Sequence, residues 1–152
     1  MEGQNVATPI NEVLAQKGRI FITIAPSATV FEAVQLMDAK NIGSLLVLNA
    51  QGKIAGIFTE RDCFRKVILA GKSPQEEQVK AVMTKKVFYA TPDMTVDECM
   101  ALMTETRTRY MPVLDEDEKI LGIISLGDLV KFVVSERDAM IRDLEKYIEG
   151  SL

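Results

Sequence analysis

At 152 residues and 47% hydrophobic, the chain is long enough to bury a core, and its net charge of -4 excludes an overall basic field for nucleic acid or anionic membranes. No segment approaches the roughly 20 apolar residues of a membrane span, and the start lacks the features of a signal peptide, so we expect a cytoplasmic protein. Without histidine, and with Cys63 and Cys99 as its only cysteines, the chain lacks the residues of zinc sites and of Ser-His or Cys-His catalysis, so we expect neither a metal nor an enzyme.

The first predicted elements are a short helix and a strand. Thr8 and Pro9 fit the N-cap and the first helical position, and the helix should end near Gly18. The β-branched and aromatic run over residues 20–24 predicts a strand, which Pro26 closes.

A helix, two strands and a second helix follow. Thr29 and Glu32 predict a capping box for a helix that extends to about Lys40. Two apolar strands with a turn between them are then expected, followed by a helix and a polar linker, over residues 45–48, 54–58, 60–70 and 72–81.

The sequence repeats itself once, because residues 26–65 align without a gap on residues 92–131 at a constant offset of 66. Thirteen of the forty aligned positions are identical. Similarity at a fixed period indicates two copies of one supersecondary unit that bury their apolar faces together. The second copy predicts the same order of strand, helix, strand, strand and helix, over residues 87–90, 96–104, 111–114, 120–124 and from 126 onward.

We therefore expect a mixed α/β (α+β) fold, in which two βαββα repeats pack with pseudo-two-fold symmetry and carry additional helices at both ends. The predicted parts are an N-terminal helix, a first repeat, a linker, a second repeat and a C-terminal helical extension, over residues 1–17, 18–71, 72–81, 82–135 and 136–152. The apolar stripe of the last helix continues beyond the repeat. It either packs on the chain's own repeats or serves as the partner helix of a homodimer.

Both repeats place a hydroxyl residue three positions before an aspartate where a strand meets a helix, as Thr59 with Asp62 and Ser125 with Asp128. Such a pair is the ordinary way to begin a helix. The same spot also suits a phosphate, because it offers backbone N–H groups and the positive end of a helix, while a carboxylate accepts both hydroxyls of a ribose. Finding the pair twice, in register, favours a binding role.

These features resemble a tandem pair of CBS domains, also called a Bateman module, and are similar to small stand-alone bacterial CBS proteins. The resemblance covers roughly residues 18–135 and rests on the two helix starts, two strands and the two glycine-to-aspartate strand exits, at residues 29–30, 95–96, 43–47, 109–113, 56–62 and 122–128. It implies a non-catalytic regulatory module in signal transduction, often dimeric. Such modules bind AMP, ADP, ATP, NAD(H) or S-adenosylmethionine as ligands in clefts between the repeats, with no cofactor used in catalysis, and signal by conformational or oligomeric change.

The resemblance further implies two nucleotide sites, each combining a ribose-binding aspartate with residues from elsewhere in the chain. The first site would use Ile57, Thr59, Arg61 and Asp62 with Thr84, Val87, Arg107, Thr108, Arg109, Tyr110 and Met111. The second site would use Ile123, Ser125 and Asp128 with Lys17, Gly18, Phe21, Ile42, Gly43 and Ser44.

The two sites differ in charge, since the first can draw on arginines for phosphate where the second has Gly127 in place of Arg61 and Gly43 in place of Arg109. Our hypothesis is that the Asp62 site is the tighter one for a di- or triphosphate. The alternative function is a structural or interaction homodimer whose clefts stay unoccupied. The acidic run at residues 115–118 is expected to be a solvated hairpin tip.

Overall fold

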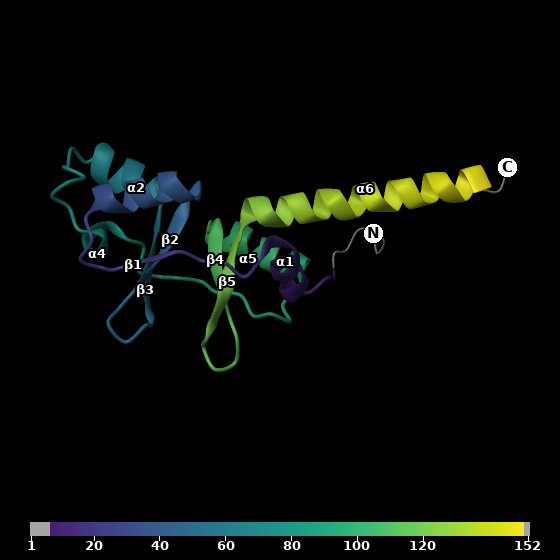
Figure 1. The fold of residues 1–152 in the computed structure, drawn as a ribbon, viewed down its shortest axis with the longest axis horizontal. Coiled ribbons are helices and arrows are strands. Elements are labelled where there is room, and N and C mark those ends of the chain that lie inside the picture. The colour runs from purple at the N-terminus through teal and green to yellow at the C-terminus, as the bar shows by residue number, and fades with distance from the viewer. Residues whose placement is uncertain (1–6, 151–152) are drawn as a thin grey trace. The chain divides into compact units, whose positions relative to one another are not determined.

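A computed structural model describes residues 7–150 of the protein, which fold into two compact units (Figure 1). The first-repeat unit spans Ile20–Phe88, and the second-repeat unit combines residues 7–19 with residues 89–150. The expected linker at residues 72–81 lies inside the first-repeat unit, and the expected N-terminal helix belongs to the second-repeat unit. Within the described residues, no helix is long and apolar enough to cross a membrane.

The first-repeat unit is a small mixed sheet with helices packed against it. Its elements are β1 (Thr23–Ile24), α2 (Val30–Lys40), β2 (Ser44–Leu48), β3 (Ile54–Thr59), α3 (Glu60–Cys63), the π-helix η2 (Phe64–Ile68) and α4 (Val79–Val82). Strand β1 pairs with β2 in parallel, and β2 pairs with β3 antiparallel. The apolar face of α2, with Val30, Ala33 and Met37, packs into a core that includes Leu45 and Phe58.

The second-repeat unit has the same plan around an antiparallel strand pair. Its elements are α1 (Ile10–Lys17), α5 (Val96–Thr106), β4 (Tyr110–Leu114), β5 (Ile120–Ser125) and α6 (Leu126–Gly150). Helix α1 packs against β5 and the start of α6, while the second half of α6 runs clear of the other elements of its unit (Figure 1).

Helix α4 precedes the second repeat in the sequence but belongs to the first-repeat unit. Helix α1 precedes the first repeat but belongs to the second-repeat unit. The Val79 N–H at the start of α4 donates to the carbonyl of Ala28, and the Ile10 N–H at the start of α1 donates to the carbonyl of Met94, both at 2.8 Å. Ala28 and Met94 are equivalent positions at the offset of 66. Helix α4 therefore packs with the first repeat and α1 with the second, which brings the residues that follow these helices next to β3 and β5.

The two units also share their irregularities. Each hairpin has a register shift, after Val47 in one and after Val113 in the other. The first helix of each repeat ends on a residue with left-handed backbone angles, Asn41 (φ 54°) after α2 and Arg107 (φ 57°) after α5. The predicted repeat is therefore confirmed down to single backbone conformations.

Some predicted boundaries were wrong. Helix α1 starts at Ile10 with Pro9 at the N-cap. The strand expected at residues 20–24 shrinks to the two residues of β1, and that expected at 87–90 is only a bridge from Ala90 to Val113. The helix expected to reach residue 70 turns into η2 after Cys63, where the Leu69 N–H bonds to the carbonyl five residues earlier. Of the predicted box at Thr29, only the bond from the Glu32 N–H to the threonine oxygen forms, whereas the box of Thr95 and Glu98 is complete.

Gly56 in β3 allows the segment after α4 to cross the strand closely. A Cβ atom added there would lie 2.7 Å from the Met83 Sδ and 2.8 Å from the backbone oxygen of Thr84. The backbone cannot move away easily, because Thr84 pairs with Ile57 through two backbone hydrogen bonds.

We predict that Gly56→Ala lowers the free energy of unfolding by about 1–3 kcal/mol, the usual cost of overpacking. Gly127→Ala is the matched control, since its Cβ would meet only the Ser125 Oγ at 3.6 Å. It should stabilise by up to about 1 kcal/mol, because alanine favours the helix. Urea unfolding of both variants measures the difference, and equal stabilities would contradict the close approach at Gly56.

Candidate functional site

The first candidate carboxylate, Asp62, forms part of the start of helix α3. Thr59 is the N-cap: its hydroxyl accepts the Asp62 N–H at 3.3 Å, and the Asp62 Oδ2 accepts the Thr59 N–H at 3.0 Å. These reciprocal bonds satisfy two backbone donors that a helix start leaves free. The capping interpretation of the motif is therefore correct, and a binding role would use the same side chain.

The remaining acceptor positions of Asp62 are also filled. Oδ2 accepts the Thr59 hydroxyl at 3.2 Å, and Oδ1 accepts the Thr84 hydroxyl at 2.9 Å and lies 3.0 Å from the Lys66 ammonium. An ionised carboxylate offers about four lone-pair sites, so these four donors saturate it. Asp62 is 5% exposed, whereas the Lys66 side chain is 45% exposed. A ligand hydroxyl would have to displace one of these donors, and Lys66 is the most accessible.

The second candidate carboxylate, Asp128, is bound by fewer groups. The Ser125 hydroxyl accepts the Asp128 N–H at 3.0 Å, and the Asp128 Oδ2 accepts the Ser125 N–H at 2.8 Å. The Lys17 ammonium donates to the same Oδ2 at 2.5 Å and to the carbonyl of Ile123 at 2.7 Å. Oδ1 has no hydrogen-bond donor among residues 7–150, so Asp128 keeps one open oxygen.

The residues predicted for the first site fall in both units. Those in the first-repeat unit are Ile57, Thr59, Arg61, Asp62, Thr84 and Val87, and those in the second-repeat unit are Arg107, Thr108, Arg109, Tyr110 and Met111. Thr84, Thr59 and Asp62 are brought together by the bonds described above. The side chains of Arg61, Arg107 and Arg109 are exposed.

Two predicted contacts lie in the interior instead. Met111 is fully buried, with its sulfur 3.8 Å from the Cys99 Sγ, and the Ile57 side chain is also buried. Strand β4 buries three consecutive residues, Met111 among them, and Ile57 lies in β3 where the segment that contains Thr84 pairs with the strand. Their role at an adenine ring stays a prediction.

The residues predicted for the second site are divided in the same way. Lys17, Gly18, Ile123, Ser125 and Asp128 lie in the second-repeat unit, and Phe21, Ile42, Gly43 and Ser44 lie in the first-repeat unit. Ser44 is buried at the start of β2.

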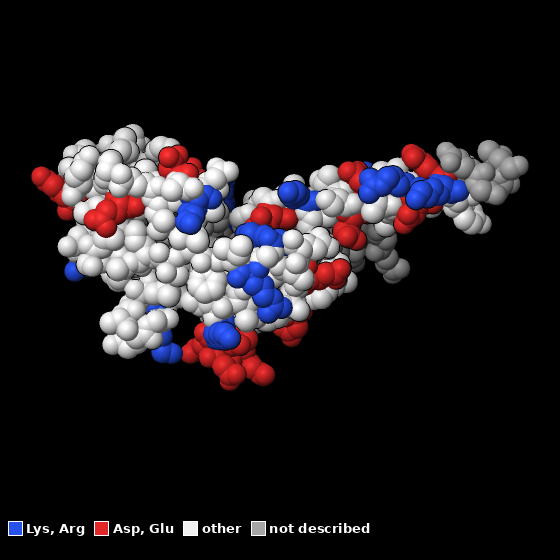
Figure 2. Space-filling view, viewed as in Figure 1, with Lys and Arg blue, Asp and Glu red and all other residues white. Residues whose placement is uncertain are grey.

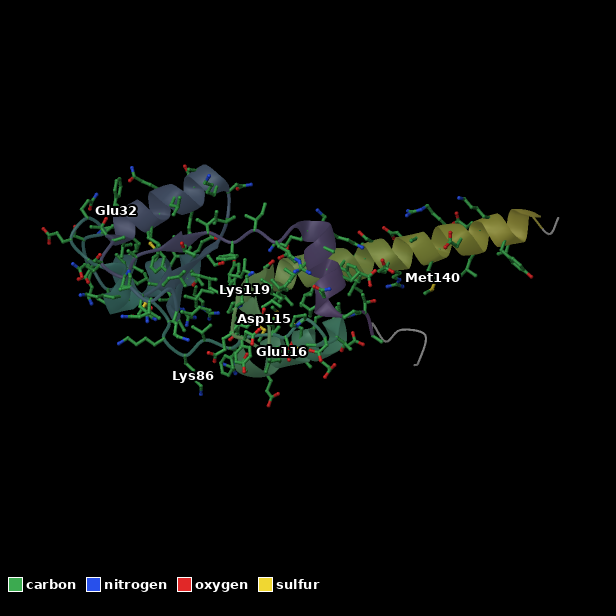
Figure 3. All side chains as sticks on the ribbon, turned by 60° about the horizontal axis from the view of Figure 1, so that its bottom comes forward. Glu32, Lys86, Asp115, Glu116, Lys119 and Met140 are labelled. Carbon is green, nitrogen blue, oxygen red and sulfur yellow. The ribbon has the colours of Figure 1, made fainter. Side chains whose placement is uncertain are left out.

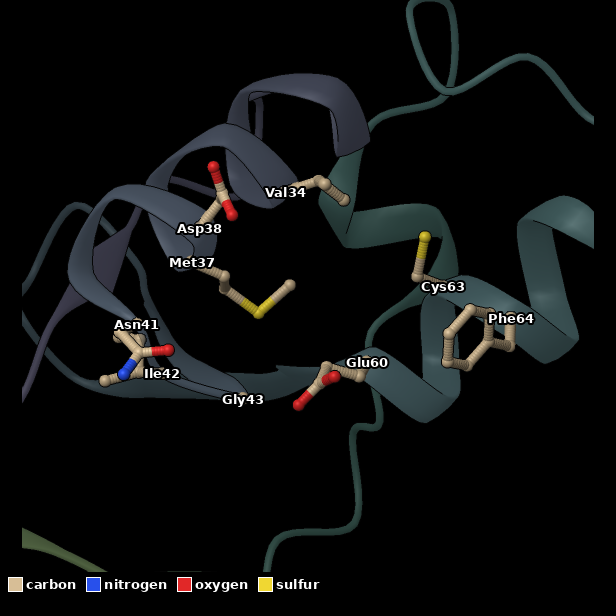
Figure 4. Close-up of a pocket in the computed structure, with 9 residues that line it drawn as sticks. All are labelled: Val34, Met37, Asp38, Asn41, Ile42, Gly43, Glu60, Cys63 and Phe64. Carbon is tan, nitrogen blue, oxygen red and sulfur yellow. The ribbon is translucent and has the colours of Figure 1, made fainter.

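Ile42 and Gly43 line a pocket of about 390 Å³ within the first-repeat unit (Figure 4). Its other lining residues come from α2, the loop after it, α3 and η2: Val34, Met37, Asp38, Asn41, Glu60, Cys63 and Phe64. We did not predict that α2 contributes to it. The spacing of Val34 and Met37, three residues apart on one helix face, is the only sequence signal that marks them, and it is shared by ordinary core residues.

The two thiols are poor nucleophiles where they lie. Burial raises the pKa of Cys63, and it raises the pKa of Cys99 to about 11. Both thiols are therefore protonated near neutral pH. Among the described residues, no group of three or more carboxylates and cysteines is arranged to hold a metal ion.

The acidic run at residues 115–118 forms the tip of the hairpin between β4 and β5, where acidic side chains gather (Figures 2 and 3). The Asp115 Oδ1 accepts the N–H groups of Asp117 and Lys119 at 2.9 and 2.8 Å. At the equivalent position of the other hairpin, Asn49 accepts the same two bonds from Gln51 and Lys53. The first acidic residue thus shapes the turn, as expected of a hairpin tip.

Comparisons with known proteins agree with this architecture. The family model of the CBS domain matches residues 18–69 and 79–135. The mitochondrial CBS domain-containing protein CBSX3 of Arabidopsis thaliana is 36% identical to this chain, over 95% of this chain and 73% of that protein. An uncharacterised protein of Methanopyrus kandleri is 34% identical, and the chain spans 58% of its length.

Solved structures with CBS domains have the same fold. A protein with CBS domains from Burkholderia ambifaria is 46% identical, with a TM-score of 0.80 over 84% of this chain and 95% of that one. A CBS-domain protein of Agrobacterium tumefaciens is 38% identical, with a TM-score of 0.77 over 84% of this chain and 95% of that one.

Two further structures were solved with a ligand or as an assembly. A CBS domain pair in complex with 5′-methylthioadenosine and S-adenosylmethionine is 24% identical, with a TM-score of 0.76 over 86% of this chain and 98% of that one. The hexameric CBS-CP12 protein of bloom-forming cyanobacteria is 32% identical, with a TM-score of 0.73 over 83% of this chain and 68% of that one. The family model matches two repeats that together cover most of this chain. The chain therefore belongs to the CBS domain family and carries two CBS domains in tandem, which together form a regulatory module.

Proposed function

We propose that the protein is a non-catalytic sensor that binds an adenine nucleotide (AMP, ADP, ATP or NAD(H)) through the carboxylates of Asp62 and Asp128. The observation that carries this proposal is the equivalence of the two strand-to-helix junctions. Each holds a carboxylate and a hydroxyl in fixed positions, next to backbone N–H groups of a helix start. A carboxylate held in this way can accept the two hydroxyls of a ribose with little loss of side-chain entropy.

The fold neighbour in complex with 5′-methylthioadenosine and S-adenosylmethionine supports an adenosine-containing ligand. At 24% identity the likeness shows a shared fold, and the adenosine class of ligand is our proposal for this chain. Binding must also stabilise one arrangement of the repeats or subunits over another, because a ligand with equal affinity for both arrangements shifts neither. We further propose that the protein works in the cytoplasm, where its free thiols stay reduced.

The two proposed sites differ in the arginines that could bind the phosphate groups of a ligand. Arg61 lies beside Asp62 in α3, and Arg107 and Arg109 are the further arginines proposed for this site, whereas Gly127 follows Ser125 at the equivalent place. We therefore propose that the Asp62 site is the tighter one for ATP, with Lys66 leaving the carboxylate as the ligand binds. Guanidinium groups pair with phosphate through two parallel hydrogen bonds, which supports this order.

A thermal-shift screen of AMP, ADP, ATP, NAD, NADH and S-adenosylmethionine tests the proposed ligand class. A ligand at about 100 times its dissociation constant should stabilise the protein by about 2.7 kcal/mol. This stabilisation raises the melting temperature by several degrees. No shift with any of these compounds at millimolar concentration would favour the homodimer with unoccupied sites.

Calorimetry with ATP on Asp62→Asn and Asp128→Asn tests the order of the sites. Asparagine keeps the size and one acceptor oxygen but loses the charge, so each variant should still begin its helix. We expect Asp62→Asn to weaken the tighter ATP binding about tenfold or more, the effect of losing hydrogen bonds to a charged group. If Asp128→Asn abolishes the tighter binding while Asp62→Asn leaves it intact, the order is wrong.

We also propose that the protein is a homodimer in which α6 contacts a second copy. Apolar side chains on the second half of this helix are exposed: Met140, Ile141, Leu144, Tyr147 and Ile148. Figure 3 labels Met140 on the part of α6 that runs clear of its unit. Charged side chains lie along the face of α6 seen in Figure 2. Most of the stability of a helix in a protein comes from packing of its apolar face, so a partner surface would stabilise this exposed half of α6. The hexameric CBS-CP12 neighbour shows that proteins of this fold assemble.

Leu144→Glu should lower the mass in light scattering from dimer to monomer, because it places a charge within the apolar stripe. Lys146→Gln is the matched control, since it changes the net charge by the same amount on the opposite face of the helix. A Leu144→Glu protein with the mass of the wild type would contradict a dimer through α6.

A further inference from the structure

The two candidate carboxylates carry different donors at the same position. In the first-repeat unit, the Thr84 N–H donates to the carbonyl of Ile57 at 2.8 Å and the Thr84 hydroxyl donates to Asp62 at 2.9 Å. In the second-repeat unit, Ile123 and Asp128 occupy the equivalent positions. There the ammonium of Lys17 alone makes both contacts, at 2.7 Å to the Ile123 carbonyl and 2.5 Å to Asp128.

The different lengths of α4 and α1 explain why a threonine serves one carboxylate and a lysine the other. Helix α4 ends at Val82, so the chain is extended when it reaches Thr84, which pairs with Ile57 through backbone bonds in both directions. Helix α1 continues to Lys17 and ends at Gly18, which has no side chain. The lysine side chain therefore reaches back to Ile123 and Asp128, the equivalents of the residues that Thr84 bonds in the other unit, although it bonds Oδ2 of the carboxylate where Thr84 bonds Oδ1.

The two arrangements differ in how easily they open. Thr84 is held in place by its backbone pairing with Ile57, so its hydroxyl can leave Asp62 only by rotation about the Cα–Cβ bond and stays beside the carboxylate. Lys17 is held only by the end of a flexible side chain, and the side chains of Lys17 and Asp128 are 31% and 25% exposed. Lys17 can rotate into solvent while the backbone stays in place.

We propose that Lys17 is a displaceable plug in the Asp128 site. Its ammonium occupies one carboxylate oxygen, Oδ2, and the carbonyl of Ile123, so a ribose diol that uses both carboxylate oxygens can bind only after the ammonium has left. Lys17 therefore lowers the affinity of the site and makes it depend on salt. This inference rests on the proposed function, since it assumes that Asp128 accepts ribose hydroxyls.

Adenosine is the probe that isolates this effect. It carries the diol but no phosphate, so it gains nothing from a nearby ammonium. An exposed ion pair changes a binding constant by about two- to fivefold. We expect Lys17→Met to bind adenosine tighter by this factor, measured from the amide resonances of Ser125 and Asp128 in an NMR titration of the full chain.

Two further measurements separate the plug from other effects of the substitution. Lys80→Met is the control for loss of one positive charge, since Lys80 is exposed on α4 and has no carboxylate partner among the described residues; it should leave the affinity unchanged. Raising the salt concentration should tighten adenosine binding to the wild type toward the value of Lys17→Met, because salt weakens the ion pair, while the variant responds little.

Equal or weaker adenosine binding by Lys17→Met would overturn the plug and leave the nucleotide proposal standing. Weaker binding would make Lys17 a residue that contacts the ligand. No adenosine binding to either protein at millimolar concentration would overturn both the plug and the proposal that Asp128 accepts a ribose.

Discussion

In both units one carboxylate holds the turn from a strand into a helix. Asp62 accepts the Thr59 N–H at the end of β3, and Asp128 accepts the Ser125 N–H at the end of β5. These bonds fix the first turn of the following helix and, with it, the direction in which α3 or α6 leaves the sheet. The proposed ribose contacts use the same carboxylates, so helix formation itself holds each carboxylate in place for a ligand.

Helix α4 packs with the first repeat and α1 with the second. This packing decides which further hydrogen-bond donor reaches each carboxylate. Helix α4 delivers Thr84 to Asp62, which is then saturated, while the longer α1 delivers Lys17 to Asp128 and leaves one oxygen open. The two copies of the motif therefore differ in the hydrogen-bond donors around their carboxylates, because different residues lie beside them. Their cores and hairpins remain alike, down to the register shifts and the left-handed C-caps.

Local patterns in the sequence were enough to predict much of this fold. The periodic apolar residues of α2 and α5 and the hairpins of β2 to β5 lie where the repeat and the turn residues indicated, because their signals extend over several consecutive residues. Residues 87–90 carry a strand-like composition but pair only at Ala90, since strand formation depends on a partner that local composition does not identify.

Contacts between distant residues were beyond such reasoning. Lys17 and Asp128 lie 111 positions apart, and the resemblance assigned both to one site without indicating an ion pair between them. Met111 is fully buried, as its apolar strand indicated, while its predicted contact with a ligand stays a prediction. The change from α3 to a π-helix has no periodic signature over so few residues.

The central claim is that Asp62 and Asp128 bind the ribose of an adenine nucleotide, and a crystal structure of the full chain grown with millimolar AMP tests it most directly. The account predicts ribose hydroxyls within hydrogen-bond distance of one or both carboxylates, with Lys66 or Lys17 moved away from the occupied one. AMP bound elsewhere, with both carboxylates keeping their present donors, would contradict it.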